Sequence, residues 1–162
     1  MDEPDRTPGT LDTDHVEVRT LSTDDLEWMV RIDREHSGHS RRGYYEVKLA
    51  EAQRDTGVRI SLAALVGGTP AGFLMGRVYY GEFGQPDATA ILDTIAVAKA
   101  FAGQGVGEAL LRQLRLNLQG LRIDRIQTLV EWDQLGLLGF FRHMGFQPAP
   151  RLCLELSVNT RD

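Results

Sequence analysis

The apolar positions of this 162-residue chain change their spacing several times, and each change marks a new predicted element. Apolar residues alternate or run together, as they do in strands, over 15–19, 58–66, 71–80, 88–97, 126–132 and 152–158. Helical spacing appears from Ser22 or Thr23 to a break at 37–43, then over 44–54, over 106–118 and over about ten residues ending at 144–146. Strands come first and then alternate with helices, an order that predicts an α/β fold with helices packed on one mixed sheet.

Glycine marks several of the predicted connections. The sequence Gly67-Gly68-Thr69-Pro70 between two strand-like runs predicts an antiparallel hairpin. Gly120 and Gly145 are placed to end the third and fourth helices, because glycine readily takes the left-handed conformation that closes a helix. Residues 1–14 show no periodicity and are predicted to be a flexible tail, so that 15–162 would form one domain.

Composition narrows the class of protein. The net charge is −5, and so acidic a chain lacks the basic stripe of a nucleic-acid-binding protein and offers little to an anionic membrane surface. No apolar run approaches the roughly 20 residues of a membrane helix, and the acidic start 1–5 is unlike a secretory signal. Cys153 is the only cysteine, so no internal disulfide can form and we expect a cytoplasmic protein with a buried structural thiol.

The most distinctive local feature is the sequence Gly103-x-Gly105-x-Gly107 between a strand-like run and a helix. Glycines lack a Cβ, so an anion can approach the backbone closely, and the first amides of a helix have no partner of their own. These properties predict a diphosphate site formed by the main-chain N–H groups from Gln104 to Glu108. The alternative is a turn that only lets the strand and the helix pack closely.

Two sharper phosphate motifs do not fit this segment. A P-loop requires Lys followed by Ser or Thr after its second glycine, whereas Glu108 and Ala109 follow Gly107. A dinucleotide fingerprint requires a third glycine where Leu110 stands, and an acidic residue at the end of the next strand, which Asp124 precedes. Another kind of nucleotide-binding α/β domain is therefore disfavoured.

A larger set of features resembles the GNAT acetyltransferase superfamily. It comprises the strand 91–97, a five-residue gap to Gly103, the leucine-rich helix and the later run Phe140–Phe146. The resemblance implies a GNAT-like α/β fold whose central sheet is mixed, twisted and largely antiparallel, with about six to seven strands and about four flanking helices. It also implies acetyl-CoA or another acyl-CoA as cosubstrate, no metal, and a homodimer as one expected assembly.

In this family the glycine turn holds the CoA pyrophosphate, and the end of the preceding strand bonds the pantetheine arm. The implied CoA-binding residues are Ile95, Ala96, Val97, Ala102, Gly103, Gln104, Gly105, Val106, Gly107, Glu108 and Phe141. Two of them depart from the family's pattern. Ala102 stands where Gln or Arg usually opens the turn, and Phe141 stands where a Tyr often protonates the departing thiolate.

The missing tyrosine need not abolish catalysis. A thiol with a pKa of about 8.5 leaves tolerably without an acid, and general acid help is worth about 10²–10⁴-fold. Tyr80, at a strand end, is a candidate acid, while Tyr79 is expected to point to the other face. Phe141 is expected to serve in packing.

An amine acceptor must lose a proton before it attacks, because an ammonium of the Lys type has a pKa of about 10.4. The candidate bases, in order of preference, are Asp93, Glu131, Glu82 and Asp133, which lie on strands, near strand ends or in the adjoining loop. Asp93 is in register with Ile95 and Val97 if the strand is regular, but a bulge would flip that register. The alternative for each carboxylate is a capping or solvated role.

The first two helices and the loop at 79–83 would shape the acceptor site in such a protein. The candidate acceptor-binding residues are Arg41, Arg42, Tyr44 and Tyr45. Arg binds carboxylates in a bidentate fork, although both arginines could instead pair with acids of the chain itself. His36 and His39 lack companions for a metal site and are expected to be solvated loop residues, and Trp28 and Trp132 are expected in the core.

The sequence therefore predicts an N-acetyltransferase. It would move an acetyl or other acyl group from acyl-CoA to a primary amine of a small molecule, peptide or protein, by direct attack in a ternary complex. Holding the thioester and the amine together would supply most of the catalysis. The alternative is a CoA-binding or regulatory module of the same fold that has lost catalysis.

Overall fold

The structure, a computed structural model, describes residues 13–54, 60–81, 84 and 87–159. The candidate base Glu82 and most of the predicted tail at 1–14 lie outside the described residues. The chain divides into two compact units, Met1–Leu129 and Val130–Asp162.

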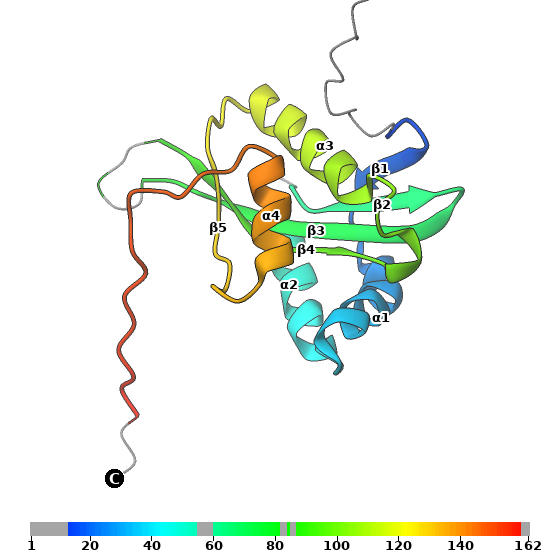
Figure 1. Ribbon diagram of the computed structural model, residues 1–162, viewed down its shortest axis with the longest axis horizontal. Coiled ribbons are helices and arrows are strands. Elements are labelled where there is room, and N and C mark those ends of the chain that lie inside the picture. Colours follow the sequence, from blue (N-terminus) through cyan, green and yellow to red (C-terminus); the bar gives the residue numbers. More distant parts are fainter. Residues whose placement is uncertain (1–12, 55–59, 82–83, 85–86, 160–162) are drawn as a thin grey trace, which may run out of the picture. The chain divides into compact units, whose positions relative to one another are not determined.

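The first unit is built on a mixed sheet of five strands in the order β1-β2-β3-β4-β5 (Figure 1). The strands are β1 (Val16–Thr20), β2 (Leu62–Val66), β3 (Thr69–Tyr79), β4 (Thr89–Val97) and β5 (Ile126–Thr128). The first four pair antiparallel, and β5 pairs parallel with β4. The predicted α/β fold and the antiparallel hairpin at 67–70 are confirmed, although the described sheet has five strands rather than six to seven.

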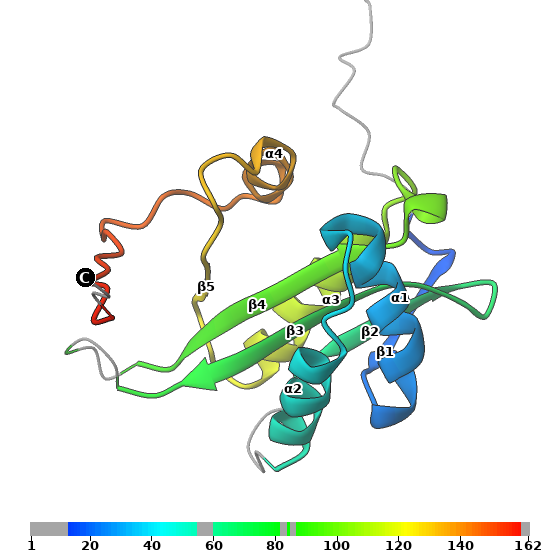
Figure 2. The ribbon, with the colours of Figure 1, turned by 90° about the horizontal axis from the view of Figure 1, so that it is seen from below.

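Helices cover both faces of this sheet (Figure 2). On one face lie α1 (Leu26–Ser37), which follows the short 3-10 helix η1 (Thr23–Asp25), and α2 (Arg42–Arg54). On the other face lies α3 (Val106–Gly120), which follows the 3-10 helix η2 (Lys99–Phe101). The helical spacing read from the sequence is confirmed for all three α-helices.

The core beneath α1 and α2 is centred on Phe73 of β3. The rings of Trp28 and Tyr45 meet the Phe73 ring edge-on, with centroids 6.0 and 5.6 Å away, and both Tyr45 and Phe73 are fully buried. Edge-to-face rings at this separation are favourable beyond their buried area. On the opposite face α3 buries a leucine-rich row, which includes Leu110 and Leu114.

The second unit contains α4 (Leu135–His143). Gly145 takes the left-handed conformation with φ 91°, and the N–H of Phe146 donates to the carbonyl of Phe141 at 2.9 Å. The Phe146 ring then lies against that of Phe141, with centroids 4.9 Å apart. This is the helix end predicted from the glycine and the aromatic residue that follows it.

Three predictions for the second unit are wrong. Residues 152–158 form no strand, and Leu152, Leu154, Leu156 and Val158 are each between 84% and 89% exposed. Alternating apolar residues predict which face of a strand each side chain would occupy. A strand also needs a neighbouring backbone with which it can form hydrogen bonds. Cys153 and Trp132 are likewise exposed, whereas Trp28 in the first unit is buried as expected.

Two classes of feature are not found among the described residues. No helix there combines the length and the apolar character that crossing a bilayer requires. No group of three or more His, Cys, Asp and Glu side chains there is arranged to hold a metal ion.

Candidate active site

A β-bulge interrupts β4 at Asp93. Thr94 pairs with Met75 of β3, and Leu92 pairs with the next residue, Gly76, so that Asp93 is one residue too many for the ladder. Such an extra residue reverses the alternation of side chains between the two halves of a strand. The regular register is therefore not the one that forms.

The bulge determines the face toward which Asp93 points. Ala96 packs against the core beneath α1 and α2, so a regular strand would send Asp93, three residues earlier, to the opposite face. Instead Asp93 lines a cavity together with Lys48 and Glu51, which belong to α2. The flipped register brings the first-ranked candidate base to the face that α2 covers.

Asp93 is held by its neighbour on β3. Nη1 of Arg77 donates to Oδ1 of Asp93 at 2.5 Å, and Nε of Arg77 donates to the hydroxyl of Tyr79 at 2.8 Å. Burial alone would lower the pKa of Arg77, but the nearby Asp93 carboxylate and the Tyr79 hydroxyl raise it above its usual value. Arg77 is thus a permanent cation, and Oδ2 of Asp93 makes no hydrogen bond to the described residues.

The tyrosine beside this group is Tyr79 rather than Tyr80. Arg77 and Tyr79 are two residues apart on β3 and share a face, and their hydrogen bond joins Tyr79 to Asp93 through one guanidinium. Tyr80 follows the end of the strand and is 67% exposed. The structure thus brings Tyr79, and not the expected Tyr80, beside Asp93.

The end of β4 offers unpaired backbone groups at the sheet edge. The N–H of Ala98 donates to the carbonyl of Ala71 at 2.8 Å, so alternation turns the backbone groups of Ile95 and Val97 away from β3. On the other side β5 pairs with β4 only as far as Leu92. Within the first unit Ile95 and Val97 therefore face an open edge, whereas the backbone groups of Ala96 face β3.

The end of α1 contacts this same edge. Nε2 of His36 lies 2.7 Å from the carbonyl oxygen of Val97, and because a carbonyl only accepts, Nε2 carries the proton. The Glu35 carboxylate accepts a hydrogen bond from the N–H of Lys99 at 2.8 Å. His36 is exposed, as expected, but it belongs to α1 rather than to a loop. A lone histidine near a helix end carries no sequence signal for such a contact.

The glycine turn follows β4 and η2 directly. Gly103 and Gly105 have φ of 75° and 79°, in the left-handed region that favours glycine. Gly105 is the N-cap of α3, and its carbonyl accepts the first helical bond, from the N–H of Ala109. The N–H groups of the four residues from 105 to 108 consequently have no partner among the described residues.

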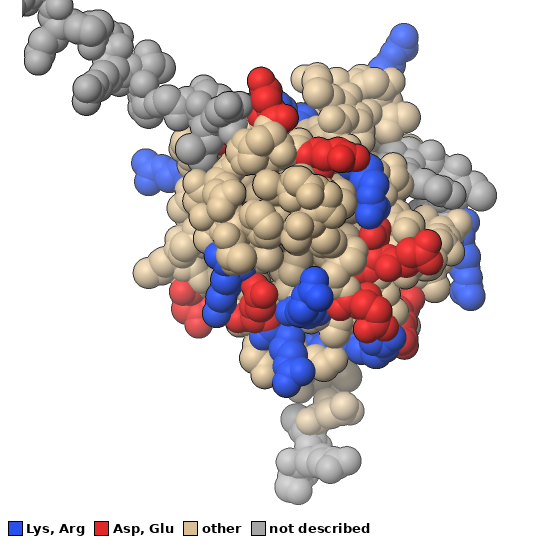
Figure 3. Space-filling model, turned by 90° about the vertical axis from the view of Figure 1, so that its right-hand side faces the viewer, with Lys and Arg blue, Asp and Glu red and all other residues tan. Residues whose placement is uncertain are grey.

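One member of the predicted anion site differs from the rest. The N–H of Gln104 donates to the carbonyl of Phe101 at 3.3 Å and is therefore engaged within the turn. Glu108, which would bring a negative charge beside an anion, is paired with Arg112 at 3.1 Å. On the side of the molecule shown in Figure 3, Lys, Arg, Asp and Glu side chains surround a central area that has none of them.

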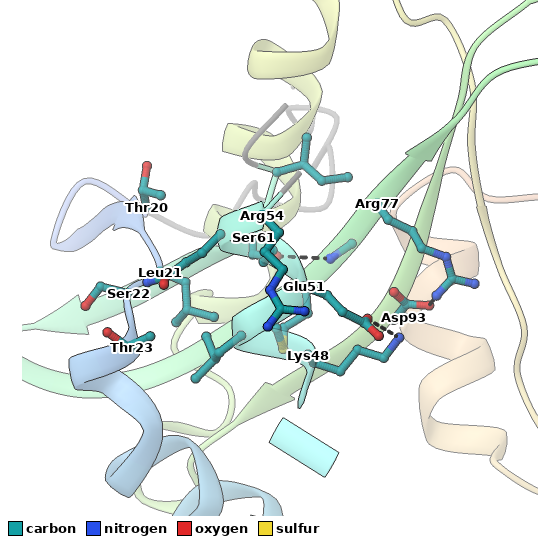
Figure 4. Close-up of a pocket in the computed structure, with 16 residues that line it drawn as sticks. Thr20, Leu21, Ser22, Thr23, Lys48, Glu51, Arg54, Ser61, Arg77 and Asp93 are labelled. Atoms are coloured by element: carbon teal, nitrogen blue, oxygen red, sulfur yellow. Dashed lines mark hydrogen bonds and ion pairs between the residues drawn. The ribbon is translucent and has the colours of Figure 1, made fainter. Parts of the chain in front are cut away.

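The cavity that Asp93 lines has a volume of about 490 Å³ and lies between α2, η1 and the sheet (Figure 4). Its apolar wall includes Leu49, Ile60 and Met75. Its polar lining residues are Thr20, Ser22, Thr23, Lys48, Glu51, Gln53, Arg54, Ser61, Arg77 and Asp93. A small-molecule site typically has this size and this mixture of apolar walls and a few polar groups.

The four predicted acceptor-binding residues at 41–45 lie in other surroundings. Arg41 donates two hydrogen bonds to Asp33, and Tyr45, which is fully buried, donates its hydroxyl to the same carboxylate at 2.8 Å. Arg42 pairs with Glu27 at 2.5 Å and with Glu46 at 3.0 Å. The arginines therefore pair with acids of the chain, as the alternative interpretation held, and Tyr44 remains 39% exposed beside Arg41.

The remaining candidate residues belong to the second unit. Glu131 and Asp133 are exposed there, between β5 and α4. Phe141 is buried, with its ring 5.5 Å from that of Phe140 and 4.9 Å from that of Phe146. These contacts are those of a packing residue.

Comparison with known proteins identifies the family to which the chain belongs. The sequence profile of the Acetyltransferase (GNAT) family matches residues 21–146, and the chain therefore belongs to the GNAT acetyltransferase family. No curated protein sequence matches the chain.

Solved structures share the fold at low sequence identity. A transcriptional regulator from Bacillus halodurans C-125 has a TM-score of 0.72 and 22% identity, over 88% of this chain and 99% of that one. The aminoglycoside N-acetyltransferase AAC(6')-Iy in complex with CoA has a TM-score of 0.74 and 14% identity, over 94% and 99%. The ribosomal-protein-alanine N-acetyltransferase of Brucella melitensis biovar Abortus 2308 has a TM-score of 0.70 and 16% identity, over 88% and 98%.

Proposed function

We propose that the protein is an N-acetyltransferase that moves an acetyl group from acetyl-CoA to a primary amine. Membership of the GNAT family supports the class of reaction. Structural neighbours named as acetyltransferases of aminoglycosides and of a ribosomal-protein alanine support an amine as the acceptor. The acceptor would be a small-molecule amine or the amine of a peptide or protein.

The observation that carries the proposal is the arrangement of β4. The bulge turns the Asp93 carboxylate into a cavity, while two residues later Ile95 begins a row of backbone groups that face the open edge. The strand then leads into a turn with free N–H groups at the start of α3. The amine would thus bind at the bulge of β4, and the extended, phosphate-bearing cosubstrate would bind along the end of the same strand and at the turn that follows it.

The CoA moiety would be held mainly by the backbone. Its diphosphate would accept hydrogen bonds from the N–H groups of residues 105–108, at the positive end of the α3 dipole. The pantetheine amides would pair with Ile95 and Val97 as an added strand does. His36 would fix the Val97 carbonyl in position, while the second lone pair of that carbonyl stays available.

The acceptor would enter from the cavity. Its ammonium would donate to Oδ2 of Asp93, the oxygen that Arg77 leaves free, and would lose one proton through that carboxylate to water. The neutral nitrogen would then attack the thioester carbonyl and the carbon–sulfur bond would break. The nitrogen would lose a second proton to give the amide, and the CoA thiolate would take up one proton. Positioning of the two substrates would supply most of the rate enhancement.

Replacement of Asp93 tests this function. In the Asp93→Asn variant kcat should fall by about 10²–10⁴-fold, the usual contribution of general base catalysis, because an amide cannot accept the proton. The measurement is release of the CoA thiol from acetyl-CoA in a screen of primary amines. Asp124→Asn is the control, since Asp124 is an exposed carboxylate in the loop before β5.

A separate measurement of acetyl-CoA binding shows whether the substitution affects catalysis or affinity for the cosubstrate. Acetyl-CoA should stabilise Asp93→Asn against heat as much as it stabilises the unmodified protein, because the substitution leaves the turn and the strand edge intact. If acetyl-CoA binds but no amine, peptide or polyamine releases the thiol, the chain is the CoA-binding module that has lost catalysis. Unchanged kcat in Asp93→Asn would remove Asp93 from the reaction.

A further inference from the structure

The cavity beneath α2 carries an excess of positive charge that acetyl transfer by itself does not require. Its lining includes three cationic side chains and two anionic ones. Lys48 pairs with Glu51 at 3.3 Å and Arg77 pairs with Asp93 at 2.5 Å. Arg54 forms neither an ion pair nor a hydrogen bond with the described residues, so its guanidinium is available to a ligand.

Arg54 lies between two groups of residues that line the cavity (Figure 4). Arg54 is the last residue of α2, and in the close-up it lies between the charged pairs around Asp93 and the hydroxyl-bearing residues Thr20, Ser22 and Thr23. A guanidinium group donates hydrogen bonds to anionic oxygens. An acceptor with its amine at Asp93 would therefore extend its other end toward donors.

We propose that the acceptor is a small amine that also bears an anionic oxygen group, a carboxylate or a phosphate. This inference rests on the proposed acetyl transfer and names the substrate class of the same site. The amine meets Oδ2 of Asp93, and the anionic group meets the guanidinium of Arg54, whose planar fork binds carboxylate and phosphate alike. A cavity of about 490 Å³ accommodates a molecule of amino-acid size.

The same charges select against a polycation. A ligand with several ammonium groups would place one of them near Arg54, where the like charges repel and no unpaired carboxylate compensates. The net charge of −5 for the whole chain does not alter this, because both acids that line the cavity already have cationic partners. The acceptor class thus differs from the aminoglycosides of the structural neighbours.

Arg54 is distinguished from the two arginines first considered for an acceptor carboxylate. Arg41 and Arg42 both bind carboxylates of the chain itself. A ligand could engage them only by displacing those partners, whereas Arg54 has none to displace among the described residues. The choice of Arg54 therefore follows from the ion pairs and not from sequence position.

Matched pairs of acceptors test the proposal. The full chain is assayed for thiol release from acetyl-CoA with amino acids and their carboxamides, with phosphoethanolamine and ethanolamine, and with the polycation neamine. Within at least one pair the anionic member should have a kcat/KM up to about fivefold higher, through a lower KM, as expected for one charge-assisted contact to the exposed Arg54 side chain. The pair that shows this difference distinguishes a carboxylate from a phosphate.

Variants connect the preference to Arg54. Arg54→Gln should bring the two members of the preferred pair to within about twofold of each other, by raising the KM of the anionic member alone. Arg54→Lys should keep part of the preference. Arg115→Gln is the control of equal charge change, because Arg115 is exposed on α3 across the sheet, and it should leave the ratio unchanged.

The outcomes separate this inference from the proposed function. If neamine or the uncharged members are acetylated best, or if Arg54→Gln leaves the ratio unchanged, the inference is overturned while acetyl transfer stands. If no amine is acetylated, the proposed function fails and ligand-induced thermal stabilisation decides the inference. An anionic amine that stabilises the unmodified protein but not Arg54→Gln then supports the site, and no stabilisation by any of them overturns it.

Discussion

At the scale of single residues, one inserted position determines the chemistry of β4. Asp93 is the bulged residue, and without the bulge its carboxylate would face α3 rather than the cavity. The sequence allows both registers, because hydrophobic alternation across 88–97 does not reveal an extra residue in the ladder. The identity of Asp93 as a candidate base was therefore predictable, but its direction was not.

Tyr79 is the residue that we expect to donate a proton to the departing CoA thiolate. Nε of Arg77 donates to the Tyr79 oxygen, which leaves the phenol proton free to be given to a departing thiolate. Phe141 cannot donate a proton, so we expect Tyr79→Phe to lower kcat by about 10–100-fold, near the lower part of the range for general acid catalysis. The measurement is steady-state thiol release at saturating acetyl-CoA.

Tyr80→Phe is the matched control, because Tyr80 is adjacent in sequence but lies beyond the end of β3 and is largely exposed. Its kcat should be unchanged. A larger loss in Tyr80→Phe than in Tyr79→Phe would restore the placement expected from the sequence and contradict the one in the structure.

At the scale of elements, the start of α1 depends on one buried carboxylate. Asp25 accepts hydrogen bonds from Arg19, from the N–H of Ser22 and from Nε1 of Trp28. Burial alone would raise the pKa of Asp25, but these three donors lower it below its usual value. Because α1 also carries Glu35 and His36 to the end of β4, this anchor supports the candidate site.

The lowered pKa gives a pH dependence of definite sign. A carboxyl with a lower pKa in the folded state stabilises the fold above its unfolded pKa of about 3.9, and that stabilisation is lost as the pH falls through the folded value. Asp25→Asn should therefore cost about 1–3 kcal/mol of unfolding free energy at pH 7, with Arg19 partly screened by solvent. The difference from the unmodified protein should shrink below about pH 4.

Urea denaturation at several pH values measures this difference. Asp24→Asn is the control, since Asp24 is exposed in the same short helix η1. A destabilisation by Asp25→Asn that stays constant from pH 7 to pH 3 would show that the hydrogen-bonded charge is not its cause.

At the scale of the whole molecule, the first unit followed from sequence patterns more fully than the second. The strands and helices up to β5 were predictable, because their hydrophobic periods persist over several residues and the elements pair with chain neighbours. In the second unit α4, its glycine end and the packing of Phe141 agreed with the prediction. Alternation at 152–158 and the aromatic character of Trp132 predicted burial, but burial depends on a partner surface that local pattern does not encode.

In the candidate site, too, local features were predictable from the sequence and features that depend on contacts between elements were not. The glycine turn was predictable, because glycines at 103 and 105 meet a backbone requirement that is local. The cavity and the free guanidinium of Arg54 were not, because they depend on which of the chain's charges pair with one another across elements. For Arg41 and Arg42 the sequence allowed both an acceptor carboxylate and acids of the chain, and the structure shows the second.

The turn before α3 is proposed to bind the phosphates of acetyl-CoA, and thermal unfolding in the presence of this ligand measures that binding. At about 100 times its Kd, acetyl-CoA should add about 2.7 kcal/mol to the unfolding free energy of the unmodified protein and raise its Tm. Gly105→Glu should abolish that rise, since its carboxylate meets the diphosphate. Gly68→Glu, at a similar φ of 78° in the β2–β3 turn, should retain it. A rise retained in Gly105→Glu, or no rise in the unmodified protein with any CoA ester at millimolar concentration, would show that this turn does not hold the phosphates of CoA.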